Sequence, residues 1–144
     1  MNFLLDTNVV SEWVKPRPDV SVVTWLNECD EDRIFLSVVT IAELRNGIEH
    51  MPSGARRDRI NKWLTEELLL RFEERLLGVD AHVATIWGIF MARGKRSGWS
   101  IGPMDACIAA IAEHHGLTLV TRNVADFKAL KITVVNPWTN PWID

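Results

Sequence analysis

Phe3-Leu4-Leu5-Asp6-Thr7-Asn8-Val9-Val10 joins an apolar run of strand length to a carboxylate and then to a helix-like pattern. Such a run, passing at once into an amphipathic pattern, predicts a buried strand feeding a helix, the first half of a βαβ unit. In folds built from these units, ligands and catalytic groups collect at the carboxyl ends of the strands. Asp6 lies at such an end, but a single aspartate there is more simply explained as the N-cap of a helix that begins at Thr7. A functional role for Asp6 therefore depends on partners elsewhere in the chain.

The composition predicts one domain. The chain has 144 residues, 47% of them hydrophobic, which suffices for one well-buried core and is too short for two ordinary domains. We therefore expect a single domain over residues 1–144. No apolar stretch approaches the roughly 20 residues that span a bilayer, and no basic segment precedes a cleavable apolar one, so we expect a cytoplasmic protein. Cys29 and Cys107 have no metal-ligand spacing and are expected in the core.

Neither the net charge nor the aromatic residues indicate a nucleic-acid-binding protein. The formal net charge of −3 is unfavourable for such binding, although it leaves room for a local basic patch. The chain has seven tryptophans and no tyrosine. Because most of these tryptophans occupy apolar helical positions, we expect them in the core and at interfaces rather than in a base-stacking platform.

Predicted strands and helices alternate along the chain. After the first strand, further strands are predicted at residues 34–36, 76–79, 117–120 and 132–135. Helical spacing of apolar residues predicts helices between them, with N-caps at Asp19, Ser37 and Asp80 and a first-turn proline at Pro103. Residues 94–98 are predicted to form a polar, flexible break. Because no hairpin dipeptides separate the strands, the expected fold is α/β, with a mainly parallel central sheet of four to five strands flanked by helices on both faces.

Four carboxylates lie near a predicted strand end or in the first turn of a helix: Asp6, Glu43, Asp105 and Asp126. Structural explanations exist for each; Thr40-Ile41-Ala42-Glu43, for example, has a capping-box pattern. However, right-handed crossovers bring the carboxyl ends of adjacent parallel strands to one edge of the sheet. We therefore expect the four side chains to lie together.

Clustered carboxylates repel one another unless a cation neutralises them. Oxygen ligands without nearby cysteine or histidine select Mg²⁺ or Mn²⁺. Such a metal can activate water and stabilise the charge on a phosphodiester. The residues alone therefore predict metal-assisted phosphodiester hydrolysis.

Four motifs, in this order along the chain, resemble a known family. They are Leu5-Asp6-Thr7-Asn8, Thr40-Ile41-Ala42-Glu43-Leu44, Gly102-Pro103-Met104-Asp105, and Val120-Thr121-Arg122-Asn123 followed by Asp126-Phe127. Together with Asn136-Pro137-Trp138, they are similar to PIN-domain toxins of the VapC type, particularly the FitB-like branch. Each motif is weak alone, but four in register are specific.

The resemblance implies a single PIN-like domain that acts as the ribonuclease toxin of a type II toxin–antitoxin pair. It also implies a homodimer, Mg²⁺ or Mn²⁺ in an acidic pocket, RNA as substrate, and a cognate VapB-like antitoxin that blocks the site. Family members place the fourth acid at the position of either Asn123 or Asp126, so this chain departs from one version of the pattern and satisfies the other.

Carried onto this chain, the resemblance gives each acid a role. Asp6 and Asp105 are expected to hold the metal, Glu43 to help ligate it or to orient the attacking water, and Asp126 to act through water. Hydrogen bonds that orient these carboxylates are expected from the supporting residues Thr7, Asn8, Thr121 and Asn123.

An acidic pocket that cleaves RNA also needs basic groups to hold the substrate. Arg93, Lys95 and Arg96 precede Asp105 around the predicted flexible break, and we take them as candidate RNA-binding residues, with a plain solvated loop as the alternative. A second cluster, Arg56, Arg57, Arg59 and Lys62, is expected to be a solvated face.

Two other functions remain open. In a haloacid-dehalogenase-like phosphatase, an aspartate at a strand end is the nucleophile, but a second aspartate would be expected where this chain has Asn8. A non-catalytic or weakly catalytic PIN-fold module could instead use the acidic groove to bind a basic peptide. The intact acidic set favours the nuclease over this binding module.

Overall fold

Five parallel strands form the central sheet of the computed structural model, which describes residues 1–99 and 101–139. The strands are β1 (Phe3–Leu5), β2 (Ile34–Ser37), β3 (Leu76–Leu77), β4 (Thr118–Val120) and β5 (Val134–Val135). They pair in the order β3-β2-β1-β4-β5, with every pairing parallel. β1 is central, and its Leu4 lies beside Phe35 on one side and Leu119 on the other. The predicted parallel sheet is therefore confirmed.

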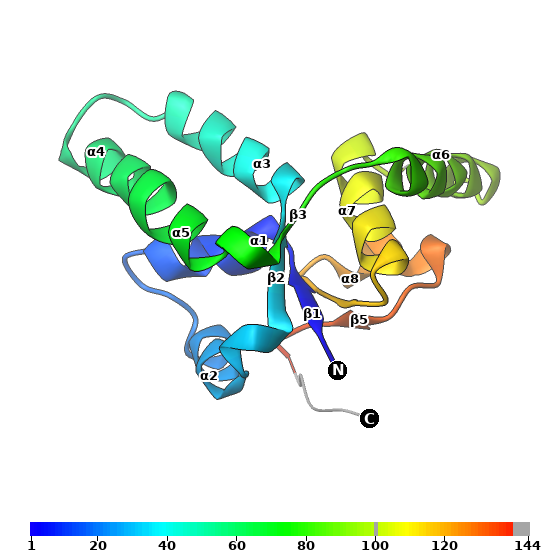
Figure 1. Cartoon of the computed structure of the whole chain (residues 1–144), viewed down its shortest axis with the longest axis horizontal. Helices are drawn as coiled ribbons and strands as arrows, with labels where there is room; N and C mark the ends of the chain where they lie inside the picture. The colour runs from blue at the N-terminus through cyan, green and yellow to red at the C-terminus, as the bar shows by residue number, and fades with distance from the viewer. Residues whose placement is uncertain (100, 140–144) are drawn as a thin grey trace.

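The helices fall into two groups, one on each face of the sheet (Figure 1). One group comprises α1 (Thr7–Val10), α2 (Val20–Glu28), α3 (Val38–Glu49), α4 (Ala55–Lys62) and α5 (Leu69–Arg71). The other comprises α6 (Ala81–Arg96), α7 (Pro103–His114) and α8 (Val124–Phe127). Short 3-10 turns cover Ser11–Val14, Glu31–Arg33, Glu73–Arg75 and Lys128–Leu130, and a π-helical segment, Trp63–Leu68, joins α4 to α5. None of the described helices is long and apolar enough to cross a membrane.

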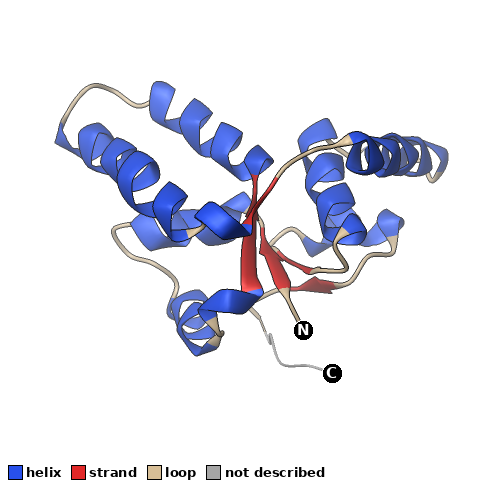
Figure 2. Cartoon of the chain, viewed as in Figure 1, coloured by secondary structure: helices blue, strands red, loops and turns tan. Residues whose placement is uncertain are grey.

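Alternating side chains divide the interior into two hydrophobic cores. In β1, Phe3 and Leu5 contribute to the core beneath α1, α2 and α3, whereas Leu4 points into the core beneath α6 and α7. Figure 2 shows the strands as a narrow layer between the two sets of helices. Cys107 is buried in the second core and Cys29 is half-buried against the first, as expected. The sheet is thus covered on both faces, as the sequence predicted.

The predicted caps are present, with one correction. The side chains of Asp19, Ser37 and Asp80 each accept a hydrogen bond from a main-chain N–H in the first turn of the helix that follows. Because Ser37 caps α3 by accepting from the Thr40 N–H at 3.2 Å, Thr40 lies inside the helix. The capping-box interpretation of residues 40–43 is therefore wrong, which leaves the Glu43 side chain free for another role.

The predicted break at residues 94–98 is wrong for its first three residues, because α6 continues to Arg96. Gly94, which suggested the break, is buried in the helix. A Cβ placed there would lie 3.0 Å from the Trp99 carbonyl oxygen and 3.0 Å from Ile101 Cγ2. The glycine therefore serves the close approach of the following segment, and the chain leaves the helix only at Gly98, whose φ is +71°.

Candidate functional site

The strand order reverses at the centre of the sheet. β2 and β3 extend from one side of β1, and β4 and β5 extend from the other. The chain segments that follow β1 and β4 therefore diverge, and in parallel α/β sheets the crevice between such segments is the usual ligand site. Asp6 follows β1 and Thr121 follows β4, so both lie at this point.

Asp6 is held by hydrogen bonds on both carboxylate oxygens. Its side chain is only 4% exposed. Oδ1 accepts from the Thr7 N–H at 2.7 Å, and Oδ2 accepts from the Thr121 hydroxyl at 2.8 Å. The Asn8 amide donates a longer bond of 3.5 Å to Oδ2. Asp6 is the N-cap of α1, as the sequence indicated, and its carboxylate has one fixed orientation.

Thr121 connects the two strand ends. Besides donating to Asp6, its buried hydroxyl oxygen accepts from the Asn8 amide at 3.3 Å and from the Asn123 N–H at 3.1 Å. The Asn8 side-chain oxygen in turn accepts from the Arg122 N–H at 3.3 Å. Three of the predicted supporting residues, Asn8, Thr121 and Asn123, thus form one network around Asp6, with Asn123 contributing its main chain.

Thr7 links Asp6 to Glu43. Its main-chain N–H binds Asp6, while its hydroxyl donates to Glu43 Oε1 at 2.7 Å. The Thr7 hydroxyl also lies 3.0 Å from that of Thr40. Since the single Thr7 proton goes to Glu43, the Thr40 hydroxyl donates to Thr7. This role of Thr40 was missed from the sequence, where its spacing to Glu43 suggested only a helix cap.

Asp105 and Asp126 complete the acidic group from the other face of the sheet. Asp105 is half-buried in the first turn of α7, and Asp126 is half-buried in α8. Burial, followed by the charges of Asp6, Asp126 and Glu43, raises the pKa of Asp105 to about 6. Burial also raises the pKa of Asp6 despite its hydrogen bonds, and the charges of Glu43 and Asp126 add to that rise. The four predicted acids therefore lie close enough to repel one another.

The acidic group suits a hard cation that retains water. Within residues 1–99 and 101–139, no three histidine, cysteine, aspartate or glutamate side chains are already arranged as a metal-ligating cluster. The donors are carboxylates that share one electrostatic neighbourhood without forming a closed cage. Mg²⁺ is bound in proteins in this way, by one or two carboxylates and several waters, so the residues fit the predicted ion.

The pKa shift of Asp105 predicts how stability depends on pH. Its folded-state pKa of about 6 lies above the ordinary 3.8, so its contribution to stability is complete below pH 3.8 and is lost as the pH rises through 6. Unscreened, the shift corresponds to about 3 kcal/mol, which solvent at this half-exposed group reduces to about 1 kcal/mol. In EDTA, the Tm of the wild type should fall relative to that of Asp105→Asn by about 3 °C between pH 4 and 7. A Tm difference that stays constant over this range would contradict the prediction.

The candidate RNA-binding residues occupy a helix rather than a loop. Arg93, Lys95 and Arg96 lie in the last turn of α6. The Arg93 guanidinium donates to the Leu130 carbonyl at 3.1 Å and lies 5.2 Å from the centre of the Phe90 ring. Arg93 therefore ties α6 to the segment after α8, whereas Lys95 and Arg96 are exposed. The predicted flexible loop for these three residues is wrong.

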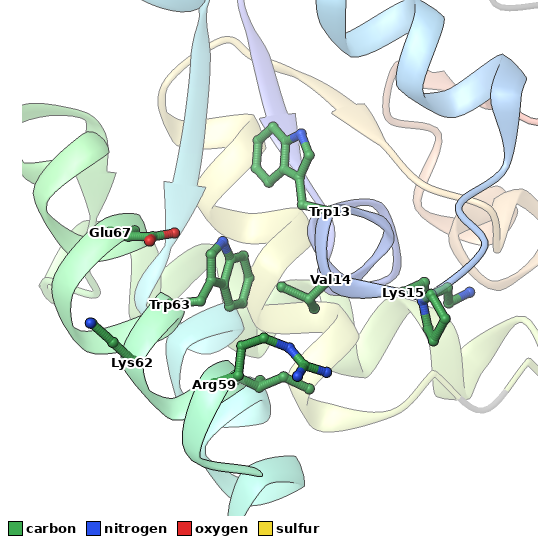
Figure 3. Close-up of a pocket in the computed structure, with 9 residues that line it drawn as sticks. Trp13, Val14, Lys15, Arg59, Lys62, Trp63 and Glu67 are labelled. Atoms are coloured by element: carbon green, nitrogen blue, oxygen red, sulfur yellow. The ribbon is translucent and has the colours of Figure 1, made fainter. Parts of the chain in front are cut away.

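A separate cavity lies on the other face of the sheet. It has a volume of about 490 Å³ and is lined by Trp13, Val14, Lys15, Pro16, Arg59, Ile60, Lys62, Trp63 and Glu67. In Figure 3 the indole of Trp63 lies between Trp13 and Arg59. Two members of the second basic cluster thus face this cavity, while Arg57 pairs with Glu49 at 3.0 Å. The lining includes none of the four acids, so this cavity is distinct from the acidic site.

One tryptophan lies outside the core. Trp99 is 43% exposed and lies beyond the end of α6, so the expectation of a core position does not hold for it. Trp25, by contrast, is 1% exposed and packs edge-on against Phe3 at 5.0 Å. The sequence did indicate that Trp99 is not a core residue, since it lies between Gly98 and Gly102, outside any helical repeat of apolar residues.

Comparison with known proteins agrees with this fold. Residues 3–132 match the PIN domain, and the chain belongs to the PIN-domain family. It is similar to Toxin FitB of Neisseria gonorrhoeae, with 38% identity over 94% of this chain and 97% of that protein. It is also similar to VapC ribonuclease Y4jK of Sinorhizobium fredii, with 38% identity over 94% of this chain and 96% of that protein.

Solved structures give the same result. The crystal structure of FitAcB from Neisseria gonorrhoeae matches with a TM-score of 0.91 and 37% identity, over 96% of this chain and 99% of that chain. The resemblance to VapC-type PIN-domain toxins and the predicted fold class are therefore confirmed.

Proposed function

We propose that this chain is the toxin of a type II toxin–antitoxin pair and that it cleaves RNA phosphodiester bonds as a metal-dependent ribonuclease. The observation that carries the proposal is the convergence of Asp6, Glu43, Asp105 and Asp126 where the strand order reverses. The names of the relatives, Toxin FitB and VapC ribonuclease Y4jK, support both parts of it.

The proposed roles follow from the contacts of each acid. Asp6 and Asp105 hold Mg²⁺ or Mn²⁺, which when bound activates water and neutralises charge on the phosphate. Glu43, fixed by the Thr7 hydroxyl, helps to ligate the metal or orients the attacking water. Asp126 acts through water. Asp6 and Asp105 have raised pKa values in the metal-free protein. The positive charge of a bound cation would lower these pKa values and so favour the ionised forms.

The proposed partners are a VapB-like antitoxin, an RNA substrate and a second copy of the chain. The similarity to the gonococcal FitAcB structure supports the first of these, and the resemblance to the toxin family implies all three. Since the substrate is cellular RNA, we place the activity in the cytoplasm.

The alternative functions gain no support from the site. The phosphatase would need an acid at position 8, but Asn8 stands there and its amide and carbonyl groups are engaged with Thr121 and the Arg122 N–H. A peptide-binding module explains why carboxylates cluster, but it does not require the hydrogen bonds that fix the orientation of the Asp6 carboxylate. Metal binding explains both.

The decisive experiment uses purified protein separated from its partner. Single-stranded RNA is incubated with Mg²⁺ or Mn²⁺, and in parallel with EDTA, using the wild type and Asp6→Asn. RNA loss is expected only for the wild type with metal. Equal loss with both proteins would indicate a contaminating nuclease and would refute the proposal, as would the absence of cleavage by a folded, partner-free wild type.

Thr121→Val is expected to lower kcat by about 10- to 100-fold with little change in overall shape. The two side chains have nearly the same volume, but valine cannot donate to Asp6 Oδ2 or accept from Asn8 and Asn123. Initial cleavage rates over a range of RNA concentrations would measure the effect. Thr139→Val, in an exposed turn, is the matched control, and equal kcat values for the two variants would contradict the role given to Thr121.

A further inference from the structure

Trp99 is anchored from two directions although its side chain is exposed. Its main-chain N–H donates to the Gly94 carbonyl at 3.0 Å, which fixes the residue against the end of α6. Its indole Nε1–H donates to the Asp126 carbonyl at 3.3 Å, which fixes the ring against α8. Gly94 permits this approach, because a side chain there would meet the Trp99 main chain. The ring therefore has a defined position.

An apolar cavity of about 400 Å³ opens beside this ring. It is lined by Ser97, Trp99, Ala125, Lys128 and Ala129. The two alanines leave room next to the indole, and the ring itself is 43% exposed. A large aromatic side chain that is both fixed and exposed is typical of a binding surface.

The cavity adjoins the acidic site. Ala125 and Asp126 are consecutive residues of α8, and the indole of Trp99 binds the main chain of Asp126 itself. The carboxylate of Asp126 is near enough to Asp6 and Asp105 to raise the pKa of both. A ligand that crosses the four acids would therefore reach Trp99 within a short distance.

The charges around the cavity are positive. Lys128 lines it, and Lys95 and Arg96 are exposed at the nearby end of α6. Within the described part of the chain, none of these three cations forms an ion pair. A flat aromatic face bordered by unpaired cations matches the two parts of a nucleotide, its base and its phosphate.

We infer that Trp99 is a stacking platform for an unpaired base of the RNA substrate, with Lys128 contacting the adjoining phosphate. This inference rests on the proposed ribonuclease function. It makes Trp99 a residue that positions the RNA substrate and contributes to its sequence preference. Single-stranded RNA is the occupant that fits, because its bases are free to leave the stack and the acidic site beside the cavity acts on its backbone.

The test compares Trp99→Leu, Trp99→Tyr and the wild type on a short single-stranded oligoribonucleotide. Trp99→Leu should raise KM roughly tenfold with kcat unchanged, and Trp99→Tyr should retain most of the affinity because tyrosine also stacks. Ile89→Ala is the control, since Ile89 is an apolar residue of α6 with a similar exposure of 48%, and its KM should equal that of the wild type. Circular dichroism checks that each variant is folded.

A second readout uses the wild type and Trp99→Tyr, in case Trp99→Leu does not fold. In EDTA, where no cleavage is expected, the affinity for oligoribonucleotides with one abasic position is measured along the sequence. Loss of one base should weaken binding roughly tenfold, and Trp99→Tyr should show its largest defect with the intact base at that same position.

The outcomes distinguish this inference from the proposed function. If the wild type cleaves RNA but Trp99→Leu has an unchanged KM, the platform is refuted and the ribonuclease stands. If neither protein cleaves RNA, the proposed function fails, and equal binding of intact and abasic RNA in EDTA would refute the platform as well. A change of sedimentation from dimer to monomer in Trp99→Leu would show that a second copy covers the ring, which also overturns the inference.

Discussion

Replacing Asp105 with asparagine is expected to reduce RNA cleavage by on the order of a thousandfold, while the metal-free protein becomes more stable at pH 7. Asparagine has the same shape but lacks the negative charge with which Asp105 would hold the cation. Burial, followed by repulsion from Asp6, Asp126 and Glu43, raises the pKa of Asp105 to about 6, and removing the charge relieves both effects. Initial cleavage rates and urea unfolding in EDTA would measure the two effects.

The control for this substitution lies on the same helix. Glu113 is exposed near the opposite end of α7, so Glu113→Gln should leave cleavage unchanged and alter stability by less than about 0.5 kcal/mol. Opposite changes in activity and stability are the signature of a group kept for function at the expense of the fold. If Asp105→Asn cleaves RNA within tenfold of the wild-type rate, Asp105 is not a metal ligand of the reaction.

Phe127→Ala is expected to lower the free energy of unfolding by about 3–5 kcal/mol. Phe127 is 1% exposed and belongs to the core beneath α6 and α7, so its removal leaves a cavity. For a domain with a total stability of about 5–15 kcal/mol, this is a large fraction. Urea unfolding followed by circular dichroism would measure the loss.

Val124→Ala provides the comparison for Phe127→Ala. Val124 lies in the same short helix but is 41% exposed, so its truncation should change stability by less than about 0.5 kcal/mol. Similar unfolding midpoints for the two variants would show that Phe127 does not anchor α8. Since Phe127 follows Asp126 directly, the loss of this anchor should also displace the fourth acid.

Local sequence patterns predicted most of the fold because strands and helix caps are determined by residues that are close together in the sequence. The strand at Phe3–Leu5 and the caps Asp19 and Asp80 follow from apolar spacing and from side chains that bond to the next turn. The four acids could be grouped because parallel strands with right-handed crossovers have only one carboxyl edge. The positions of the strands, the caps and the acids can therefore be inferred from residue types and their spacing.

The errors arose at contacts that lie outside the regular spacing of helices and strands. The extent of α6 depends on Gly94, which signals a break locally but is required by the return of Trp99 against the helix. The contact between the hydroxyl groups of Thr7 and Thr40 joins residues 33 positions apart, and no periodicity reports such a pair. The exposure of Trp99 likewise depends on α8, whose main chain holds the indole from outside the core.

The two hydrophobic cores divide the acids into pairs. Asp6 caps α1 and Glu43 lies in α3, on one face of the sheet, whereas Asp105 and Asp126 lie in α7 and α8 on the other. The spacing between the two pairs therefore depends on how both layers of helices pack against the sheet. A substitution in either core that shifts its helices would change this spacing without touching a carboxylate.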